Sequence, residues 1–283
     1  MKISVQTDNV MMLKEVIKHC DEVRFGSEFC EFKVPSIETL EEACTLTKCA
    51  GKNFTYITPR VSNLGLKKIR EHLYFLNEDE NISVVANDYG VLNILGQYSN
   101  LKPRLGRQLI YIPARCPWKD FTPYELGFMG KRRISRIFYQ TSLNCVQTIS
   151  FFKGLRVEGV DVDHIPQSFQ SFYSLVRSGL NLSVHLNLIP VAVTRKCHTA
   201  RFLGEKSLET CSRPCDKRAF LLKHDELGVQ LVLQGNVIFR PANPSRKQIN
   251  ELCKNGIDDF VITMGPATKI KSQNDIESFI QDL

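Results

Sequence analysis

The sequence lacks any long apolar run. A membrane-spanning helix needs about 18 consecutive apolar residues, whereas the most apolar stretch, residues 182–193, is shorter and contains His185, Asn187 and Pro190. The first eight residues also lack the apolar segment behind a basic start that directs secretion. We therefore expect a cytoplasmic protein without a membrane span.

Several short catalytic motifs are missing as well. No glycine-rich dinucleotide fingerprint follows the first expected strand, which disfavours a nucleotide cofactor bound in that way. The sequence has neither a Gly-x-Ser-x-Gly elbow nor a His-Glu-x-x-His zinc motif. No standard protease nucleophile or zinc site can therefore be assigned.

The excess of positive charge is small. Lys and Arg number 37 against 30 Asp and Glu, which leaves a formal charge of +7 spread thinly along the chain. The densest basic stretch is residues 131–133 with Arg136. Because no aromatic stacking motif surrounds this stretch, a solvated surface is the preferred interpretation, and RNA binding is kept as an alternative.

Short β-rich runs alternate with helical stretches along the chain. Apolar residues at helical spacing, such as Leu66, Ile69, Leu73 and Leu76, lie between runs rich in β-forming residues. The β-rich runs are residues 3–7, 22–26, 53–58, 82–87, 104–110, 159–165, 182–190 and 259–264. This order predicts an α/β fold, a TIM-barrel-like (β/α)8 barrel, with an open doubly wound sheet as the alternative.

Two further segments do not fit the simple alternation. Residues 133–139 form another β-rich run that is either a strand or an insertion. Residues 230–233 and 237–240 flank Gln234-Gly235-Asn236, a pattern that predicts a small β-hairpin inserted near the C-terminus. Since no linker or repeat interrupts the chain, we expect one barrel-like domain over residues 1–283.

Ten cysteines stand out in a chain without an export signal. In such a chain, thiols are buried, catalytic or metal-bound more often than they form a disulfide framework. Cys20, Cys44 and Cys253 fall at apolar positions of expected helices, where cysteine behaves as a small buried hydrophobe. We expect the same of Cys49 and Cys145.

The other five cysteines follow expected strands, so a barrel would bring them to its mouth. Cys197, Cys211 and Cys215 have the spacing C-x13-C-x3-C in a polar, turn-rich segment. Three thiols so close in sequence suggest a shared metal partner. The fourth ligand would be Cys30 or Cys116, and the residues alone favour Cys30 only slightly.

The same sulfurs could hold zinc or an iron-sulfur cluster. Zinc sites usually pair two short C-x2-4-C knuckles, and this chain has one. Iron-sulfur clusters are often held by three grouped cysteines and a remote one, so the spacing favours a cluster, with zinc as the alternative. Arg195, Lys196, Arg201 and Arg213 would offset thiolate charge and could also hold an anionic substrate.

Residues 196–201 (Lys-Cys-His-Thr-Ala-Arg) with Cys211 and Cys215, together with residues 26–30, resemble the collagenase-like peptidase family U-32. The late hairpin fits the same resemblance. It implies a barrel whose loops at the C-terminal face carry a 4Fe-4S cluster. The four cluster ligands would be Cys30, Cys197, Cys211 and Cys215, which selects Cys30 over Cys116.

The resemblance also implies an activity. Members of the family include oxygen-independent hydroxylases that act on a quinone precursor or on RNA bases and that work in pairs. We therefore expect a redox enzyme or enzyme subunit with a homologous partner subunit in a heterodimer and a small aromatic or quinone-like substrate. A peptidase and a non-enzymatic metal scaffold are the alternatives.

Polar residues at the ends of the expected strands are further candidates. Asp163 and His164 follow one strand and could act as a catalytic base and its orienting partner. For His164 a structural role is the alternative. The other candidates are Arg60, Asn87, Asp88, Arg107 and Asp161.

Overall fold

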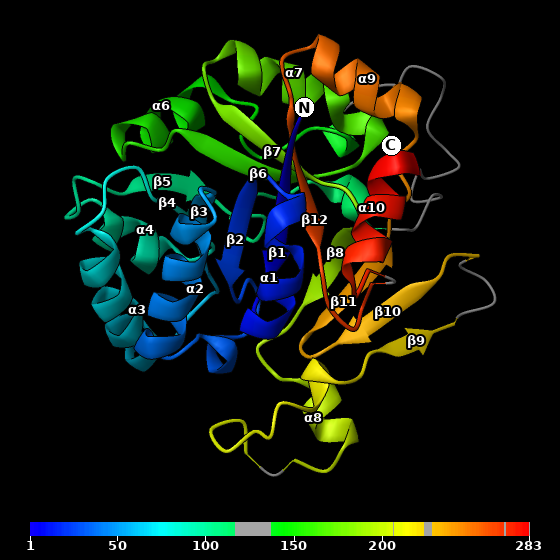
Figure 1. Ribbon diagram of the computed structural model, residues 1–283. Coiled ribbons are helices and arrows are strands. Elements are labelled where there is room, and N and C mark those ends of the chain that lie inside the picture. Colours follow the sequence, from blue (N-terminus) through cyan, green and yellow to red (C-terminus); the bar gives the residue numbers. More distant parts are fainter. Residues whose placement is uncertain (117–136, 206, 224–227, 269, 283) are drawn as a thin grey trace.

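Eight parallel strands close into a barrel. The computed structural model describes residues 1–116, 137–205, 207–223, 228–268 and 270–282. The barrel strands pair in the order β1-β12-β7-β6-β5-β4-β3-β2, and β2 pairs again with β1 (Figure 1). They are β1 (Lys2–Thr7), β2 (Glu22–Gly26), β3 (Asn53–Thr58), β4 (Ser83–Ala86), β5 (Lys102–Leu105), β6 (Gly159–Asp163), β7 (Asn181–His185) and β12 (Asp259–Thr263). Each of the eight alternating β-rich runs overlaps one of these strands, and the predicted barrel is confirmed.

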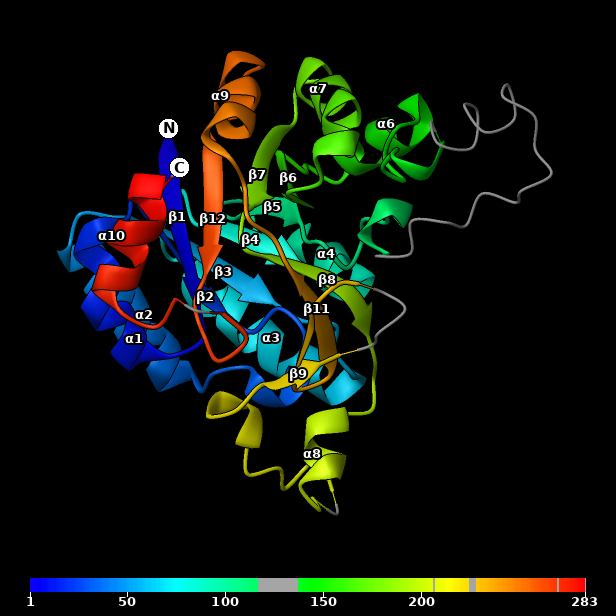
Figure 2. The same ribbon diagram turned by 90° about the vertical axis from the view of Figure 1, so that its right-hand side faces the viewer.

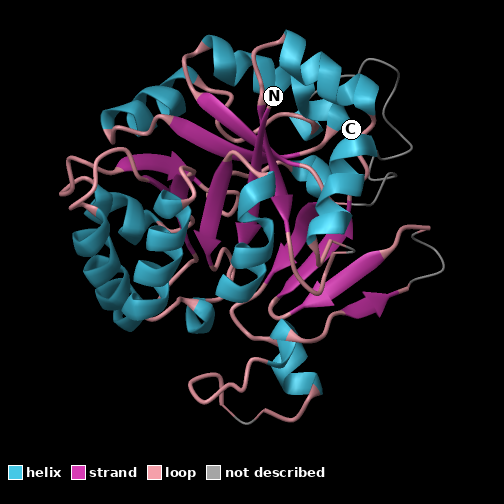
Figure 3. Ribbon diagram, viewed as in Figure 1, coloured by secondary structure: helices cyan, strands magenta, loops and turns pink. Residues whose placement is uncertain are grey.

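Helices surround the barrel (Figures 2 and 3). The α-helices are α1 (Val10–Val16), α2 (Ile37–Cys49), α3 (Asn63–Leu76), α4 (Tyr89–Leu95), α6 (Val146–Gly154), α7 (Phe169–Arg177), α8 (His198–Phe202), α9 (Arg246–Lys254) and α10 (Gln273–Asp282). Single 3-10 turns are η1 (Ile17–His19), η2 (Glu31–Lys33), η3 (Pro113–Arg115), η4 (Pro166–Ser168) and η5 (Pro214–Asp216). Among the residues described, no helix is long and apolar enough to cross a bilayer.

Helix packing follows the apolar pattern of the sequence. On α3, Ile69, Leu73 and Leu76 are fully buried against the barrel. Gly51 and Gly256 follow the ends of α2 and α9 with φ of 67° and 81°, a left-handed conformation that glycine adopts without steric cost. Both glycines therefore terminate helices.

A second, antiparallel sheet projects from the barrel. Its strand order is β8-β11-β10-β9, with β8 (Leu188–Val193), β9 (Phe220–Leu222), β10 (Leu231–Gln234) and β11 (Val237–Pro241). The predicted hairpin is β10–β11, which turns at Gly235 with φ of 63°. In Figure 1 this sheet and α8 extend below and to the right of the barrel. The structure thus places the hairpin in a larger sheet.

The predicted run over residues 182–190 is divided between the two sheets. β7 belongs to the barrel, and β8 pairs with β11 in the second sheet. Between them the side chain of Asn187 donates to the carbonyl of Thr263 at 2.7 Å and accepts from its N–H at 3.0 Å. The side chain takes over the pairing with β12, so the backbone is free to turn away.

Of the five cysteines that we expected to be buried in helices, some are buried and some are exposed. Cys20 and Cys44 are buried, and Cys253 is half-buried. Cys49 and Cys145 are exposed, so their predicted burial was wrong. Cys49 is the last residue of α2 and Cys145 directly precedes α6, where side chains can face solvent.

Some predicted features lie outside the described residues. These are the basic stretch at residues 131–133 with Arg136, and most of the β-rich run over residues 133–139. The part of that run that is described begins with a helical conformation at Ile137 and Phe138.

Candidate cofactor site

The turn of the β10–β11 hairpin lies between the segments that carry three of the predicted cluster cysteines. Asn236 Nδ2 donates to the carbonyls of Phe29 at 2.9 Å and Thr194 at 2.8 Å. Gln234 Nε2 donates to the carbonyl of Cys215 at 3.0 Å. One turn therefore binds the loop after β2, the end of β8 and the segment around η5.

Two cavities meet at Cys30. One, of about 140 Å³, is lined by Cys30 and Cys215, and the other, of about 130 Å³, is lined by Cys30 and Cys197. Gly235 borders the first cavity, and a Cβ added there would lie 3.7 Å from the Cys215 sulfur. Cys30, Cys197 and Cys215 thus surround one region of the barrel mouth.

Backbone N–H groups already point at two of the sulfurs. Cys197 Sγ accepts from the N–H of Ala200 at 3.4 Å, and Cys211 Sγ accepts from the N–H of Arg213 at 3.4 Å. Arg213 has φ of 55°, a left-handed conformation that is costly for a residue with a side chain. N–H donors to sulfur stabilise thiolates and tune the metal centres that they bind.

The thiols also interact electrostatically. Burial raises the pKa of Cys30 and Cys197, and it raises the pKa of Cys215 to about 12. The neighbouring thiols add to these rises: Cys197 acts on Cys30, Cys211 acts on Cys197, and Cys30 and Cys197 act on Cys215. Metal binding at these thiols would therefore release protons.

All ten cysteines are free, and the four predicted ligands offer only sulfur donors. Sulfur donors suit zinc and iron-sulfur clusters and are poor ligands for magnesium or calcium. Within the described residues, no three Cys, His, Asp or Glu side chains already converge on a single-ion position. By donor type, the residues fit a thiolate-bound metal centre.

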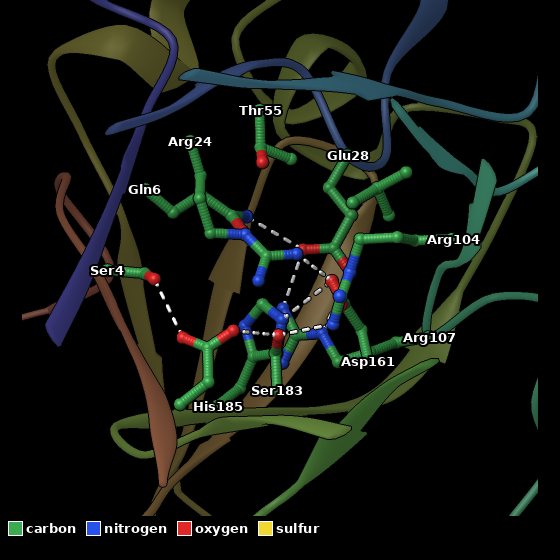
Figure 4. A network of polar contacts seen from close by, with 12 residues as sticks. Ser4, Gln6, Arg24, Glu28, Thr55, Arg104, Arg107, Asp161, Ser183 and His185 are labelled. Carbon is green, nitrogen blue, oxygen red and sulfur yellow. Dashed lines mark hydrogen bonds and ion pairs between the residues drawn. The ribbon is translucent and has the colours of Figure 1, made fainter. Parts of the chain in front are cut away.

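Below the mouth, the barrel interior is filled by ion pairs rather than by apolar side chains (Figure 4). Arg107 donates twice to Glu28, at 2.8 and 2.6 Å, and once to Asp163 at 2.9 Å. Lower in the barrel, Asp161 pairs with Arg24 and lies 3.2 Å from His185 Nε2. All six of these residues are buried.

These pairs keep the carboxyl groups ionised. Burial alone opposes the charge on Glu28, Asp161 and Asp163, but the neighbouring guanidinium groups outweigh it and lower the pKa of each carboxyl. For His185 the effect of burial is the stronger one. Together with the charge of Arg107, burial lowers the pKa of His185, although the neighbouring carboxylates act to raise it. The interior therefore holds a fixed set of charges at neutral pH.

Asp163 and His164 lie on opposite faces of the barrel wall. Asp163 faces inward and pairs with Arg107 and Arg115. His164 packs edge-on against Phe169, with ring centroids 5.6 Å apart, and burial lowers its pKa to about 4. Asp163 is the last residue of β6 and His164 directly follows it, so their side chains continue the alternation between the two faces of the strand. Their catalytic roles stay a prediction.

The other predicted mouth residues have different surroundings. Asn87 is buried and donates to the carbonyl of Thr58 at 2.9 Å, and Asp88 caps the N-terminus of α4. Arg60 is exposed and lines the cavity shared by Cys30 and Cys197. Only Arg107 and Asp161 of this group belong to the interior network.

Sequence reasoning missed several members of that network, namely Arg24, Glu28, Arg104, Arg115 and His185. A signal was present: the two aspartates of β6 alternate with valines, so both face one side of the strand. Burial of that polar side becomes visible only when the barrel closes.

Comparison with known proteins finds no matching family model and no matching curated protein. Among solved structures, the U32 peptidase Mk0906 is 12% identical over 93% of this chain and 92% of its own, with a TM-score of 0.47. An endo-1,4-beta-xylanase from Caldicellulosiruptor owensensis is 11% identical over 93% and 84%, with a TM-score of 0.42. A D-psicose 3-epimerase from Clostridium cellulolyticum H10 is 10% identical over 98% and 89%, with a TM-score of 0.41.

Proposed function

We propose that this chain carries a 4Fe-4S cluster on Cys30, Cys197, Cys211 and Cys215 and is a component of an oxygen-independent hydroxylase. The main support for this proposal is the turn of the β10–β11 hairpin. It forms hydrogen bonds with the segments of Cys30, Cys197 and Cys215, although Cys30 is far from the other two in sequence. Cys211 lies close enough to Cys197 for its charge to raise the pKa of the Cys197 thiol. Cys116 lines neither cavity beside Cys30.

Sequence resemblance favours a cluster over zinc. The cysteine motif resembles the collagenase-like peptidase family U-32 and, within it, the ubiquinone biosynthesis protein UbiV. That resemblance also motivates three parts of the proposal: a homologous partner subunit, a heterodimer, and a quinone precursor or similar aromatic compound as substrate. RNA-base hydroxylation is the alternative within the same chemistry.

The chain's own residues would bind and orient the substrate. When bound, the cluster would supply electron transfer next to the substrate. The cavity lined by Cys30 and Cys215 also has an aromatic wall, in which the rings of Phe29 and Phe239 meet edge to face at 5.4 Å. The Arg107 guanidinium lies 5.6 Å from the centre of the Phe29 ring and fixes it from behind.

Asp163 and His164 stay the predicted residues for proton transfer, and each would act separately because they lie on opposite faces of the barrel wall. Burial lowers the pKa of His164 to about 4, so its imidazole is neutral at physiological pH and would accept a proton only as a weak base. Asp163 is ionised and held by two arginines, so it would act through its charge.

A peptidase is the competing reading of the family resemblance. In the described part of the chain, no hydrogen bond joins a Ser, Thr or Cys side chain to a histidine. His72, for instance, is hydrogen-bonded to the Tyr56 hydroxyl at 2.7 Å. Such a pair is the usual means of activating a protease nucleophile. Peptide cleavage by metal-free protein would favour the peptidase.

Metal analysis tests the cluster directly. Protein purified without air should be brown, absorb broadly in the visible range, and contain about four iron atoms and about four sulfides per chain. Stoichiometric zinc without iron would refute the proposal.

A further inference from the structure

Lys33 joins the rim of the barrel to the segment that carries Cys215. It is the last residue of η2, and its side chain is only 13% exposed. Its ammonium lies 2.7 Å from Asp216 Oδ1 and also pairs with Asp8. Asp8 follows β1, and Asp216 directly follows Cys215. One largely buried cation therefore holds two parts of the chain together.

Lys33 also lies beside two of the proposed ligands. It lines the same cavity as Cys30 and Cys215 and, among the described residues lining it, is the single cation. Its ammonium acts to lower the pKa of both thiols, against the stronger effect of burial. Burial opposes the charge of Lys33 itself, but Asp8 and Asp216 outweigh it and raise its pKa. Lys33 is thus charged at any physiological pH.

We propose that Lys33 is a positioning residue of the cysteine site, which fixes the Cys215 segment against the barrel and offsets negative charge on Cys30 and Cys215. The inference rests on the proposed function, because it requires a metal group on these thiols. A buried lysine between two carboxylates could also be a simple structural contact. The two roles differ in how they affect the metal group.

Reduction potential separates the two roles. In iron-loaded protein, Lys33→Met removes a positive charge beside the ligands and should lower the potential, because the reduced state carries more negative charge. Asp216→Asn breaks the same contact but removes a negative charge, so it should raise the potential. A purely structural contact predicts shifts of the same sign for both variants, or none.

A matched control is available on α1. Lys14 pairs with Glu42 at 2.7 Å on the surface and lines neither cavity beside Cys30. Lys14→Met should leave both iron content and potential unchanged. Lys33→Arg keeps the charge and should retain iron and a potential closer to that of the unmutated protein than Lys33→Met does.

Hydrogen exchange tests the positioning role without metal. In metal-free protein, amides of residues 211–218 should exchange about fivefold faster in Lys33→Met and in Asp216→Asn than in Lys14→Met. Circular dichroism should show that all variants keep the barrel. Equal exchange in all variants would overturn the positioning role.

The remaining outcomes are also decisive. If Lys33→Met keeps full iron and the potential of the Lys14→Met control, charge compensation is wrong. If folded Lys33→Met loses iron while Lys33→Arg keeps it, the inference is supported; loss from both would overturn it. If the unmutated protein itself holds no iron, the proposed function fails, and the exchange experiment still decides the positioning role.

Discussion

The inward-facing charges are the least expected residues of this barrel. The interior of a (β/α)8 barrel is usually filled by branched apolar side chains, whereas here Arg24, Arg107, Glu28, Asp161 and Asp163 occupy it. Each is paired, and a buried charge that loses its partner is costly. The pairs therefore fix the positions of polar groups directly beneath the cysteine site.

The choice of fourth ligand is tested at single residues. Cys30→Ala should abolish cluster iron, because Cys30 borders both cavities between the other sulfurs. Cys116→Ala is the matched control and should keep the iron. Iron and sulfide analysis of both proteins, purified without air, provides the measurement. Retention of iron by Cys30→Ala together with its loss from Cys116→Ala would show that the ligand set is wrong.

At the scale of elements, the sequence predicts most of the barrel and little of the second sheet. The eight barrel strands are visible as β-rich runs because local composition marks them. In the run over residues 182–190, apolar and polar residues alternate without a break from Leu182 to Asn187. Nothing local therefore marks the change from β7 to β8, which depends on Asn187 reaching β12. Similarly, the sequence spacing of Cys197, Cys211 and Cys215 indicates that these three lie together. It gives no sign that Asn236 joins them to the loop of Cys30, because that hydrogen bond links residues distant in sequence.

The hairpin turn should control the order of the cysteine segments. Asn236→Ala removes two hydrogen bonds to backbone carbonyls, which should cost about 1–3 kcal/mol of stability and reduce iron retention. Asn255→Ala, which removes one exposed bond to the carbonyl of Glu251, is the control. Denaturant unfolding and iron loss to a chelator measure the two effects. Equal iron loss from both variants would argue against this role.

At the scale of the whole molecule, the interior ion pairs make stability depend on pH. The pKa values of Glu28, Asp161 and Asp163 are lowered in the fold. As acid is added, the unfolded chain therefore binds protons before the folded protein does. The stability from these pairs is present above about pH 5 and is lost progressively as the pH falls below the unfolded pKa values near 4. Acid should unfold the protein cooperatively.

Glu28→Gln tests this dependence. Loss of one partner from the buried pair with Arg107 should cost about 3–5 kcal/mol at pH 7 and make the loss of stability between pH 5 and pH 3 shallower. Asp79→Asn, which breaks a surface pair with Lys48, should cost less than about 1 kcal/mol. Urea unfolding at several pH values gives both numbers. An unchanged pH slope in Glu28→Gln would contradict the assignment.

The activity itself is the last prediction, and it depends on the whole assembly of barrel, cysteine segments and partner. If the chain is part of an oxygen-independent hydroxylase, deleting its gene should abolish a hydroxylated aromatic product only during growth without air. Cys211→Ala should reproduce that loss, because Cys211 lies in the segment between α8 and η5, outside the barrel strands. The barrel should stay folded, as circular dichroism would show. Full product formation by Cys211→Ala, or peptide cleavage by the metal-free protein, would require the hydroxylase proposal to be abandoned, because neither result is compatible with a reaction that needs the thiolate-bound cluster.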